Sequence, residues 1–298
     1  MSEQQPALKT YRGNCHCAAY VYEFTLPEIT KAPDCSCSVC YKKAVIWAFP
    51  KPSNVRFVKG DPETMTNHTF GRKRFNHKFC PTCGNAVMVV GHPVPLKPGE
   101  EKEPECGFNL RLLQHGQIDV WNLDLNTYDG ASLSPAYEEP KFVGSEPTAE
   151  VEGAKLYTGS CRCGAVTLAF KSKPLDKDTQ GITECNCSIC GRLGAVWIYP
   201  HKTQVVVNGE ENLKLYLSGK KAAGRMFCKI CGVPVYTKVM QLTDEEVAAM
   251  NEAAQKWYLG SKDLIPLNLR VINGLNVKDL KPNKFDGYNV IQPPYVEP

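Results

Sequence analysis

A short cysteine motif occurs twice in this chain and organises the rest of the sequence around it. Phe79-Cys80-Pro81-Thr82-Cys83-Gly84 returns 148 residues later as Phe227-Cys228-Lys229-Ile230-Cys231-Gly232. A C-x-x-C turn brings two sulfurs to one metal ion, and the glycine after it permits the positive φ that directs backbone N–H groups at sulfur. The motif therefore predicts half of a metal site in each half of the chain.

The sequence on both sides of this motif repeats in the same order. Residues 11–17 return as 157–163, displaced by 146, and residues 35–40 return as 185–190, displaced by 150. Residues 109–111 return as 268–270, displaced by 159, and Tyr128-Asp129-Gly130 returns as Phe285-Asp286-Gly287. A repeat of this length indicates two copies of one domain rather than a short-period solenoid. We expect domains at residues 8–143 and 155–298, joined by a polar linker at 144–154.

Length and composition favour two mainly β domains. The 298 residues are 43% hydrophobic and 22% charged, which excludes a disordered chain, and 23 glycines with 22 prolines argue against a helical bundle. Asn208-Gly209 suggests a hairpin turn. Runs of β-branched and aromatic residues predict strands at 18–24, 45–49, 55–58, 86–90, 166–170, 205–207, 213–217 and 233–239.

One inserted helix is expected in the second copy. Thr243 and Glu246 match a capping box, and 247–257 follows with many alanines and neither glycine nor proline. The counterpart in the first copy, 93–104, contains four prolines and cannot form this helix.

The cysteine count points to metal rather than to disulfides. The number is odd, at 15, and the N-terminus has no basic region followed by an apolar run. We therefore expect a cytoplasmic protein, in a reducing compartment where closely spaced cysteines more often bind metal. No apolar run approaches a membrane span, so no membrane partner is expected. The oligomeric state is not predicted.

Four cysteines of each copy are predicted to form a closed structural zinc site. The C-x-x-C pair would be joined by a C-x-C pair, which we expect on a strand, where residues i and i+2 point the same way. Redox motifs and unligated core cysteines are the alternatives, but no thioredoxin-like pattern surrounds these residues. The predicted ligands are Cys15, Cys17, Cys80 and Cys83, and Cys161, Cys163, Cys228 and Cys231.

The remaining repeated cysteines form a triplet in each copy: Cys35, Cys37 and Cys40, and Cys185, Cys187 and Cys190. Three ligands leave a tetrahedral metal with an open position, the general form of a catalytic zinc site. His77 or Cys106 could close the first site, but Arg225 and Ile265 replace them in the second copy. Alternatively, a triplet could share cysteines with the other site, since spacing alone does not assign ligands.

Metal binding would also change the charge of the protein. Fourteen thiolates add −14 and four Zn²⁺ add +8, so the formal net charge of +4 becomes −2. The basic bias is therefore no evidence for nucleic acid, and no nucleic-acid partner is expected. Each triplet with Zn²⁺ carries −1, which suits chemistry on a soft sulfur ligand at least as well as activation of water.

In their order, the motifs G-x-C-x-C, C-x-C-x-x-C, C-x-x-C-G and N-x-R resemble the glutathione-dependent formaldehyde-activating enzyme family, also called the centromere protein V domain family. The resemblance covers both halves of the chain. It implies two tandem zinc-binding β-tent domains, with two zinc ions per domain and up to four per chain. The structural zinc would bind the outer cysteine pairs and the second zinc the triplet.

The implied activity is that of a carbon–sulfur lyase acting on a glutathione adduct, or another thiol adduct, of a small electrophile. Glutathione or a similar thiol would be the co-substrate, and the cysteines of both triplets would form the catalytic centres. Arg111 and Arg270 are candidates for binding its carboxylates, or alternatively structural arginines that tie strands together. The alternative function is a zinc-stabilised binding module without catalysis, as in the centromere-associated branch.

The second copy is closer to the family pattern. It has Gly164, Gly194 and Arg225 where the first copy has Ala18, Ala44 and His77. Arginine offers a fixed cation, whereas histidine is mostly neutral at pH 7. We therefore expect the second triplet to be the more active centre.

Overall fold

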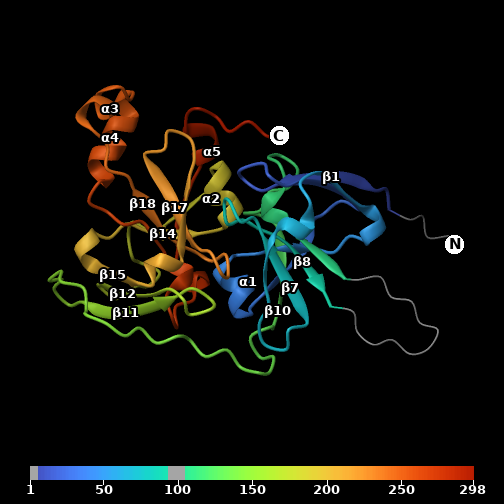
Figure 1. The fold of residues 1–298 in the computed structure, drawn as a ribbon, viewed down its shortest axis with the longest axis horizontal. Helices are drawn as coiled ribbons and strands as arrows, with labels where there is room; N and C mark the ends of the chain where they lie inside the picture. The colour runs from blue at the N-terminus through green and yellow to red at the C-terminus, as the bar shows by residue number, and fades with distance from the viewer. Residues whose placement is uncertain (1–5, 93–104) are drawn as a thin grey trace. The chain divides into compact units, whose positions relative to one another are not determined.

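Short β-strands make up most of the computed structural model, which describes residues 6–92 and 105–298 (Figure 1). The expected mainly β fold is confirmed, while the proline-rich segment 93–104 lies outside the described residues. The chain divides into two compact units. Unit 1 holds Met1–Tyr137, Gly191–Gly194 and Tyr295–Pro298, and unit 2 holds Glu138–Cys190 and Ala195–Pro294.

Unit 1 contains a three-stranded sheet in the order β1-β2-β5, a parallel pair β10-β3, and a five-stranded sheet β4-β9-β8-β7-β6. Its core includes Tyr22, Phe24 and Phe108, all buried, with the rings of Tyr22 and Phe108 4.7 Å apart. The elements are β1 (Lys9–Asn14), β2 (Val21–Leu26), β3 (Lys31–Cys35), α1 (Ser38–Lys42), β4 (Trp47–Ala48), β5 (Val55–Lys59), β6 (Thr66–His68), β7 (Phe75–Phe79), β8 (Ala86–Gly91), β9 (Cys106–Asn109) and β10 (Asp124–Tyr128).

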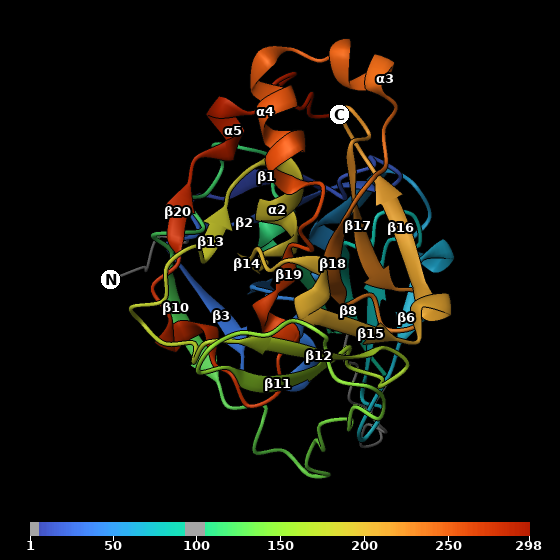
Figure 2. The same cartoon turned by 90° about the vertical axis from the view of Figure 1, so that its left-hand side faces the viewer.

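Unit 2 repeats this plan, with a sheet β11-β12-β15 and a larger sheet β16-β17-β18-β19-β14-β13-β20. Figure 2 shows β16, β17 and β18 side by side. The elements are β11 (Lys155–Ser160), β12 (Thr167–Ser172), β13 (Thr183–Cys185), α2 (Ser188–Leu193), β14 (Val196–Ile198), β15 (Val205–Asn208), β16 (Leu213–Leu217), β17 (Ala223–Cys228), β18 (Pro234–Val239), α3 (Asp244–Ala248), α4 (Glu252–Ser261), β19 (Leu267–Asn268), β20 (Asn283–Phe285) and α5 (Gly287–Val290).

The repeated Asn-Leu-Arg segment is a strand end rather than a strand. Asn109 ends β9, and Arg111 lies in the 3₁₀ turn Leu110–Leu112 that follows. The buried Asn109 side chain accepts from Arg111 N and Ile46 N and donates to Ala86 O at 3.0 Å. Asn268 makes the same three contacts in unit 2, to Arg270, Val196 and Pro234. The asparagine thus satisfies backbone groups from three segments that no regular ladder reaches.

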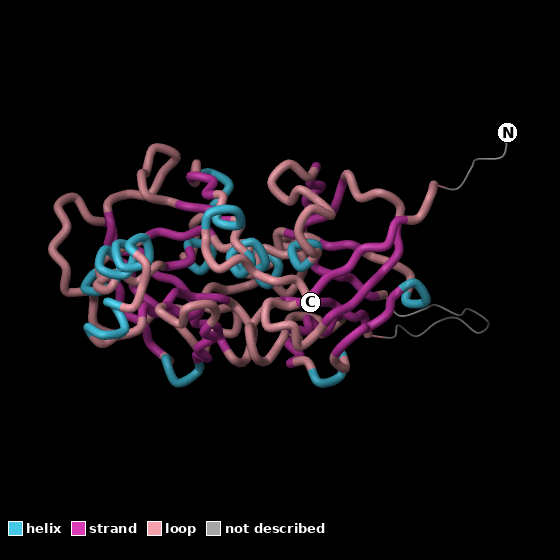
Figure 3. Tube along the Cα trace, turned by 90° about the horizontal axis from the view of Figure 1, so that it is seen from above, coloured by secondary structure: helices cyan, strands magenta, loops and turns pink. Residues whose placement is uncertain are grey.

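The predicted helix of the second copy is two helices. The capping box of Thr243 and Glu246 forms as expected and begins α3. The helix ends at Ala248, however, and Asn251 caps a new one, α4, by accepting from Ala254 N at 2.9 Å. An asparagine side chain competes for backbone N–H groups, which explains the break. Helical segments are short throughout the described chain (Figure 3).

The hairpin predicted at Asn208-Gly209 is also wrong. β15 pairs with β12, and β16 pairs with β17, so the strands on either side of the turn do not pair with each other. Gly209, with φ +79°, instead caps the 3₁₀ turn Glu210–Asn212, which carries the chain from one sheet to the next.

Unit 1 includes residues from far along the sequence. Within it, the Tyr295 ring stacks on His16 at a centroid distance of 4.7 Å, and its hydroxyl donates to His16 O at 2.8 Å. The buried Arg192 donates to Asn14 O at 3.0 Å and pairs with Glu297 at 2.7 Å. Both contacts lie beside the turn that carries Cys15.

In the described part of the chain, every helix is too short or too polar to cross a bilayer.

Two alanines of unit 1 adopt the left-handed backbone that glycine provides in the second copy. Ala18 has φ +56° where Gly164 has +79°, and Ala44 has φ +51° where Gly194 has +56°. The backbone conformation is therefore retained although the first copy has lost both glycines. For a residue with a Cβ atom, this conformation costs about 1–2 kcal/mol.

Ala18→Gly is expected to raise the free energy of unfolding of unit 1 by about 0.5–1 kcal/mol, because relief of the left-handed strain exceeds the added entropy of the unfolded chain. Gly164→Ala should lower the free energy of unfolding of unit 2, since its new Cβ would also lie 3.1 Å from Pro140 Cγ. Denaturant unfolding of the zinc-loaded chain measures both. Destabilisation by Ala18→Gly would contradict this account.

Candidate metal centres

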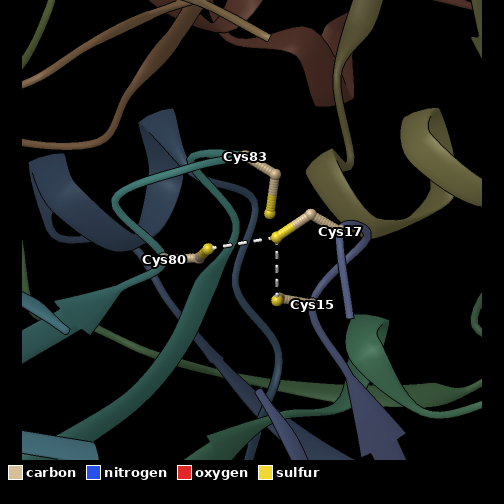
Figure 4. Close-up of side chains that lie close together, drawn as sticks. All are labelled: Cys15, Cys17, Cys80 and Cys83. Atoms are coloured by element: carbon tan, nitrogen blue, oxygen red, sulfur yellow. Dashed lines mark hydrogen bonds between the residues drawn. The ribbon is translucent and has the colours of Figure 1, made fainter. Parts of the chain in front are cut away.

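The first group of four cysteines lies where two turns meet. Cys15 and Cys17 belong to the turn between β1 and β2, and Cys80 and Cys83 to the turn between β7 and β8. Their sulfurs point toward a common centre (Figure 4), with Cys17 Sγ 3.6 Å from Cys15 Sγ and 3.5 Å from Cys80 Sγ. The left-handed Ala18 closes the first turn, so the prediction that the C-x-C pair lies on a strand is wrong.

The equivalent group in unit 2 has the same form. Cys163 Sγ lies 3.5 Å from Cys161 Sγ and 3.7 Å from Cys228 Sγ, and Cys231 completes the cluster. A backbone N–H donates to the first sulfur of each group, from Tyr20 in unit 1 at 3.4 Å and from Val166 in unit 2 at 3.3 Å. Such donors stabilise sulfur as thiolate, the form that binds metal.

The spacing of these sulfurs fits zinc. Tetrahedral Zn²⁺ with bonds of about 2.3 Å to sulfur requires sulfurs about 3.8 Å apart. The distances of 3.5–3.7 Å within the clusters are close to this value. The eight cysteines of the two groups would hold structural zinc, with each ion joining two turns.

The triplets form at the start of a short helix. Cys35 ends β3, Cys37 caps α1 and Cys40 lies within it; Cys185, Cys187 and Cys190 are placed alike on β13 and α2. In each triplet the sulfurs lie within 4.8 Å of one another, and within the described ranges neither cluster has a fourth histidine, cysteine or carboxylate. Cys106 lies apart, with its Sγ 3.6 Å from Pro50 O. The sulfurs therefore separate into groups of four and three.

Sequence reasoning missed the residues that cover each triplet. β10 runs parallel to β3 with Tyr128 opposite Cys35, and Gly130 follows. A Cβ added at Gly130 would lie 2.5 Å from Cys35 Sγ; at Gly287 in unit 2 it would lie 2.6 Å from Cys185 Sγ. Only glycine lets the backbone approach the sulfur so closely.

The aspartate before each of these glycines binds the residue between the first two cysteines. Ser36 Oγ donates to Asp129 Oδ1 at 3.1 Å, and Asn186 Nδ2 donates to Asp286 Oδ1 at 2.9 Å. The repeated Asp-Gly pair was visible in the sequence, but nothing local indicated its partner about a hundred positions away.

The third cysteine of each triplet has a different donor. Trp47 Nε1 donates to Cys40 Sγ at 3.4 Å, whereas Arg225 Nη2 donates to Cys190 Sγ at 3.3 Å. Hydrogen bonds from Cys185 and Cys187, together with the charge of Arg225, hold the pKa of Cys190 well below its ordinary value despite its burial. In the first triplet it is Cys35 whose pKa is lowered, to about 3, by hydrogen bonds from Cys37 and Cys40.

The two candidate anion-binding arginines occupy equivalent turns, and Arg111 lies close to its triplet helix. Arg111 Nε donates to Ala44 O, just beyond α1, at 2.7 Å. Arg270 follows Asn268 in the equivalent 3₁₀ turn Leu269–Val271. The hydrogen bond to Ala44 gives Arg111 a structural contact, and it holds the guanidinium beside the end of the triplet helix.

Cys83→Ser or Cys231→Ser should abolish cooperative unfolding of its unit, because a structural zinc supplies folding free energy of order 10 kcal/mol in small modules. Cys40→Ser or Cys190→Ser should retain the fold and lose one metal ion from a maximum of four. Thermal melting and elemental analysis measure both effects. Equal solubility and cooperative melting of all four variants would reverse the assignment of structural and open centres.

Gly287→Ala should lower the metal affinity of the second triplet by about 10- to 100-fold, since the new methyl group displaces the Cys185 sulfur. Gly260→Ala is the matched control, because a Cβ at that helical position meets nothing within 4 Å. Metal retention in the presence of a competing chelator distinguishes the two variants. An unchanged affinity in Gly287→Ala would mean that this backbone does not constrain the ligand.

Comparison with known proteins agrees with the cysteine motifs. Residues 10–97 and 156–257, together more than half of the chain, match the family model described as glutathione-dependent formaldehyde-activating enzyme. A crystal structure of a Rhodobacter sphaeroides protein is 25% identical, covers 43% of this chain and 98% of its own, and superposes with a TM-score of 0.33.

Proposed function

Because the chain belongs to the glutathione-dependent formaldehyde-activating enzyme family, with one copy of the domain in each half, we propose that it is a zinc-dependent carbon–sulfur lyase. Its substrate would be an adduct of glutathione, or of another thiol, with a small electrophile such as formaldehyde. The observation that carries this proposal is the pairing of a four-sulfur cluster with a separate three-sulfur cluster in each unit. A closed site supports the fold, and an open one is available for chemistry.

The reaction divides a thiol–aldehyde adduct into its parts. The hydroxyl group of the adduct loses its proton as the carbonyl forms, the carbon–sulfur bond breaks, and the sulfur leaves with the bonding electrons and takes up a proton. The reverse reaction joins the same parts. A bound zinc would supply a Lewis acid that stabilises the leaving sulfur as thiolate.

The residues of the chain would position the reacting sulfur. In each triplet the three cysteines would hold the metal, and Gly130 or Gly287 lies against the first cysteine. Arg111, held at Ala44 O beside the end of α1, and Arg270, in the equivalent turn, are proposed to bind the carboxylates of glutathione. The proposed role of the two arginines rests on their positions in equivalent turns and on their positive charge.

The test is turnover of the adduct of formaldehyde with glutathione by the zinc-loaded full chain, followed by NMR. Cys37→Ser combined with Cys187→Ser should lower kcat/KM by at least 100-fold while both structural sites keep their zinc. Of the single variants, Cys187→Ser should lose more activity. No turnover by the wild-type chain on glutathione or 2-mercaptoethanol adducts, or full turnover by the double variant, would favour a binding module without catalysis.

A further inference from the structure

The donor to the third cysteine is neutral in one triplet and cationic in the other. In unit 1 the indole N–H of Trp47 bonds to Cys40. In unit 2 Arg225 takes that place at Cys190, and the Trp197 N–H has no hydrogen-bond partner among residues 6–92 and 105–298. The tryptophans and the cysteines are equivalent in the repeat, but the residue that donates to the third cysteine is not.

The Arg225 guanidinium is held in place on several sides. Its Nη1 donates to Thr237 Oγ1 on the neighbouring strand at 3.0 Å, and its Cζ lies 5.3 Å from the centroid of the Trp197 ring. Stacking on an aromatic face and a second hydrogen bond fix the planar fork of an arginine. The charge therefore stays at Cys190 instead of turning toward solvent.

Unit 1 has no equivalent arrangement within its described residues. His77 occupies the position of Arg225, but its buried ring lies between Trp47, at a centroid distance of 6.0 Å, and Phe70, at 5.3 Å. Lys43 is a buried cation on the triplet segment, yet its ammonium group lies 4.5 Å from the centroid of the Phe79 ring. At Cys40 the donor is the neutral Trp47, whereas at Cys190 it is the cationic Arg225.

We propose that Arg225 is a positioning residue that offsets the charge of the second triplet, so that this centre binds an anionic fourth ligand, a thiolate, more tightly than the first centre does. Three thiolates and Zn²⁺ sum to −1, and an incoming anion is repelled; Arg225 brings the group to zero. The inference deepens the proposed function and rests on its assignment of the triplets as open metal centres.

Thiol binding to each centre separately tests this proposal without turnover. The full chain is loaded with Co²⁺, and the triplet not under study is disabled by Cys37→Ser or Cys187→Ser. Titration with 2-mercaptoethanol is followed by the sulfur-to-cobalt charge-transfer absorption. The second centre should bind the thiol at least tenfold more tightly than the first, the size expected of one charge-assisted hydrogen bond.

Variants of Arg225 separate charge from packing. Arg225→Met keeps the apolar stem and should lower thiol affinity at the second centre at least tenfold, while Arg225→Lys should restore part of it. Equal affinities at the two centres of the wild-type chain would overturn the proposal, as would equal effects of Met and Lys. If Arg225→Met fails to fold, the proposal is still tested by the comparison of the two centres with Arg225 present and by the thiol affinity of Arg225→Lys.

The result is distinguishable from failure of the proposed function. A chain that turns over no thiol–aldehyde adduct, but binds thiol more tightly at the second centre and loses this preference in Arg225→Met, would refute the lyase activity and support the role of Arg225. Turnover of the adduct without a difference in thiol affinity between the two centres would support the lyase activity and refute the role of Arg225.

Discussion

Thiolates held in contact repel one another, and a cation among them is what makes such a cluster stable. Each unit places four sulfurs at separations that suit a single tetrahedral metal, at the meeting of two turns between β-strands. Other features of each unit lie next to these turns. Strand irregularities occur just before Cys80 and Cys228, and a buried asparagine ties the adjoining strand ends. A metal bound at each cluster would fix both turns, so that short strands could suffice to build the unit.

The second cluster of each unit differs from the first because three sulfurs leave one position of a tetrahedral metal open. A four-sulfur site fills all four coordination positions of a tetrahedral metal, so no position is left for a substrate. The triplet takes its ligands from the end of a strand and one turn of helix, and a glycine that follows the neighbouring parallel strand lies against the first of its sulfurs. One difference between the two triplets is then the charge of the donor to the third sulfur, the neutral Trp47 or the cationic Arg225.

Local signals in the sequence predicted local structure well. The C-x-x-C-G motif contains both its ligands and the glycine of its turn, and the repeat doubled the evidence for it. The strand assigned to Cys15 and Cys17 was wrong although a signal was present, since Gly164 after the second C-x-C already marks a left-handed turn. In the second copy, one helix was predicted from the alanine content of 247–257, although Asn251 lies within this segment and its side chain caps a new helix.

Features that depend on distant pairing could not be found in this way. Gly130 meets Cys35 because two strands about ninety residues apart pair in parallel, and no periodicity reports such a pairing. The exchange of hydrogen-bond donors at Cys40 and Cys190 was equally hidden. The sequence showed histidine against arginine, but only the structure shows that the third sulfur accepts from the tryptophan in one unit and from the arginine in the other.

The inclusion of Arg192 and Tyr295 in unit 1 bears on how the duplication persists. These residues come from the second copy, yet they pack against the turn that carries the first structural cluster. A chain reduced to its first half would lack them and would expose Asn14 and His16. Loss of the second half would therefore remove contacts that the first unit uses, even if the second open centre does no chemistry. Selection for folding alone is enough to preserve a silent copy, which leaves its metal site free to drift toward another ligand.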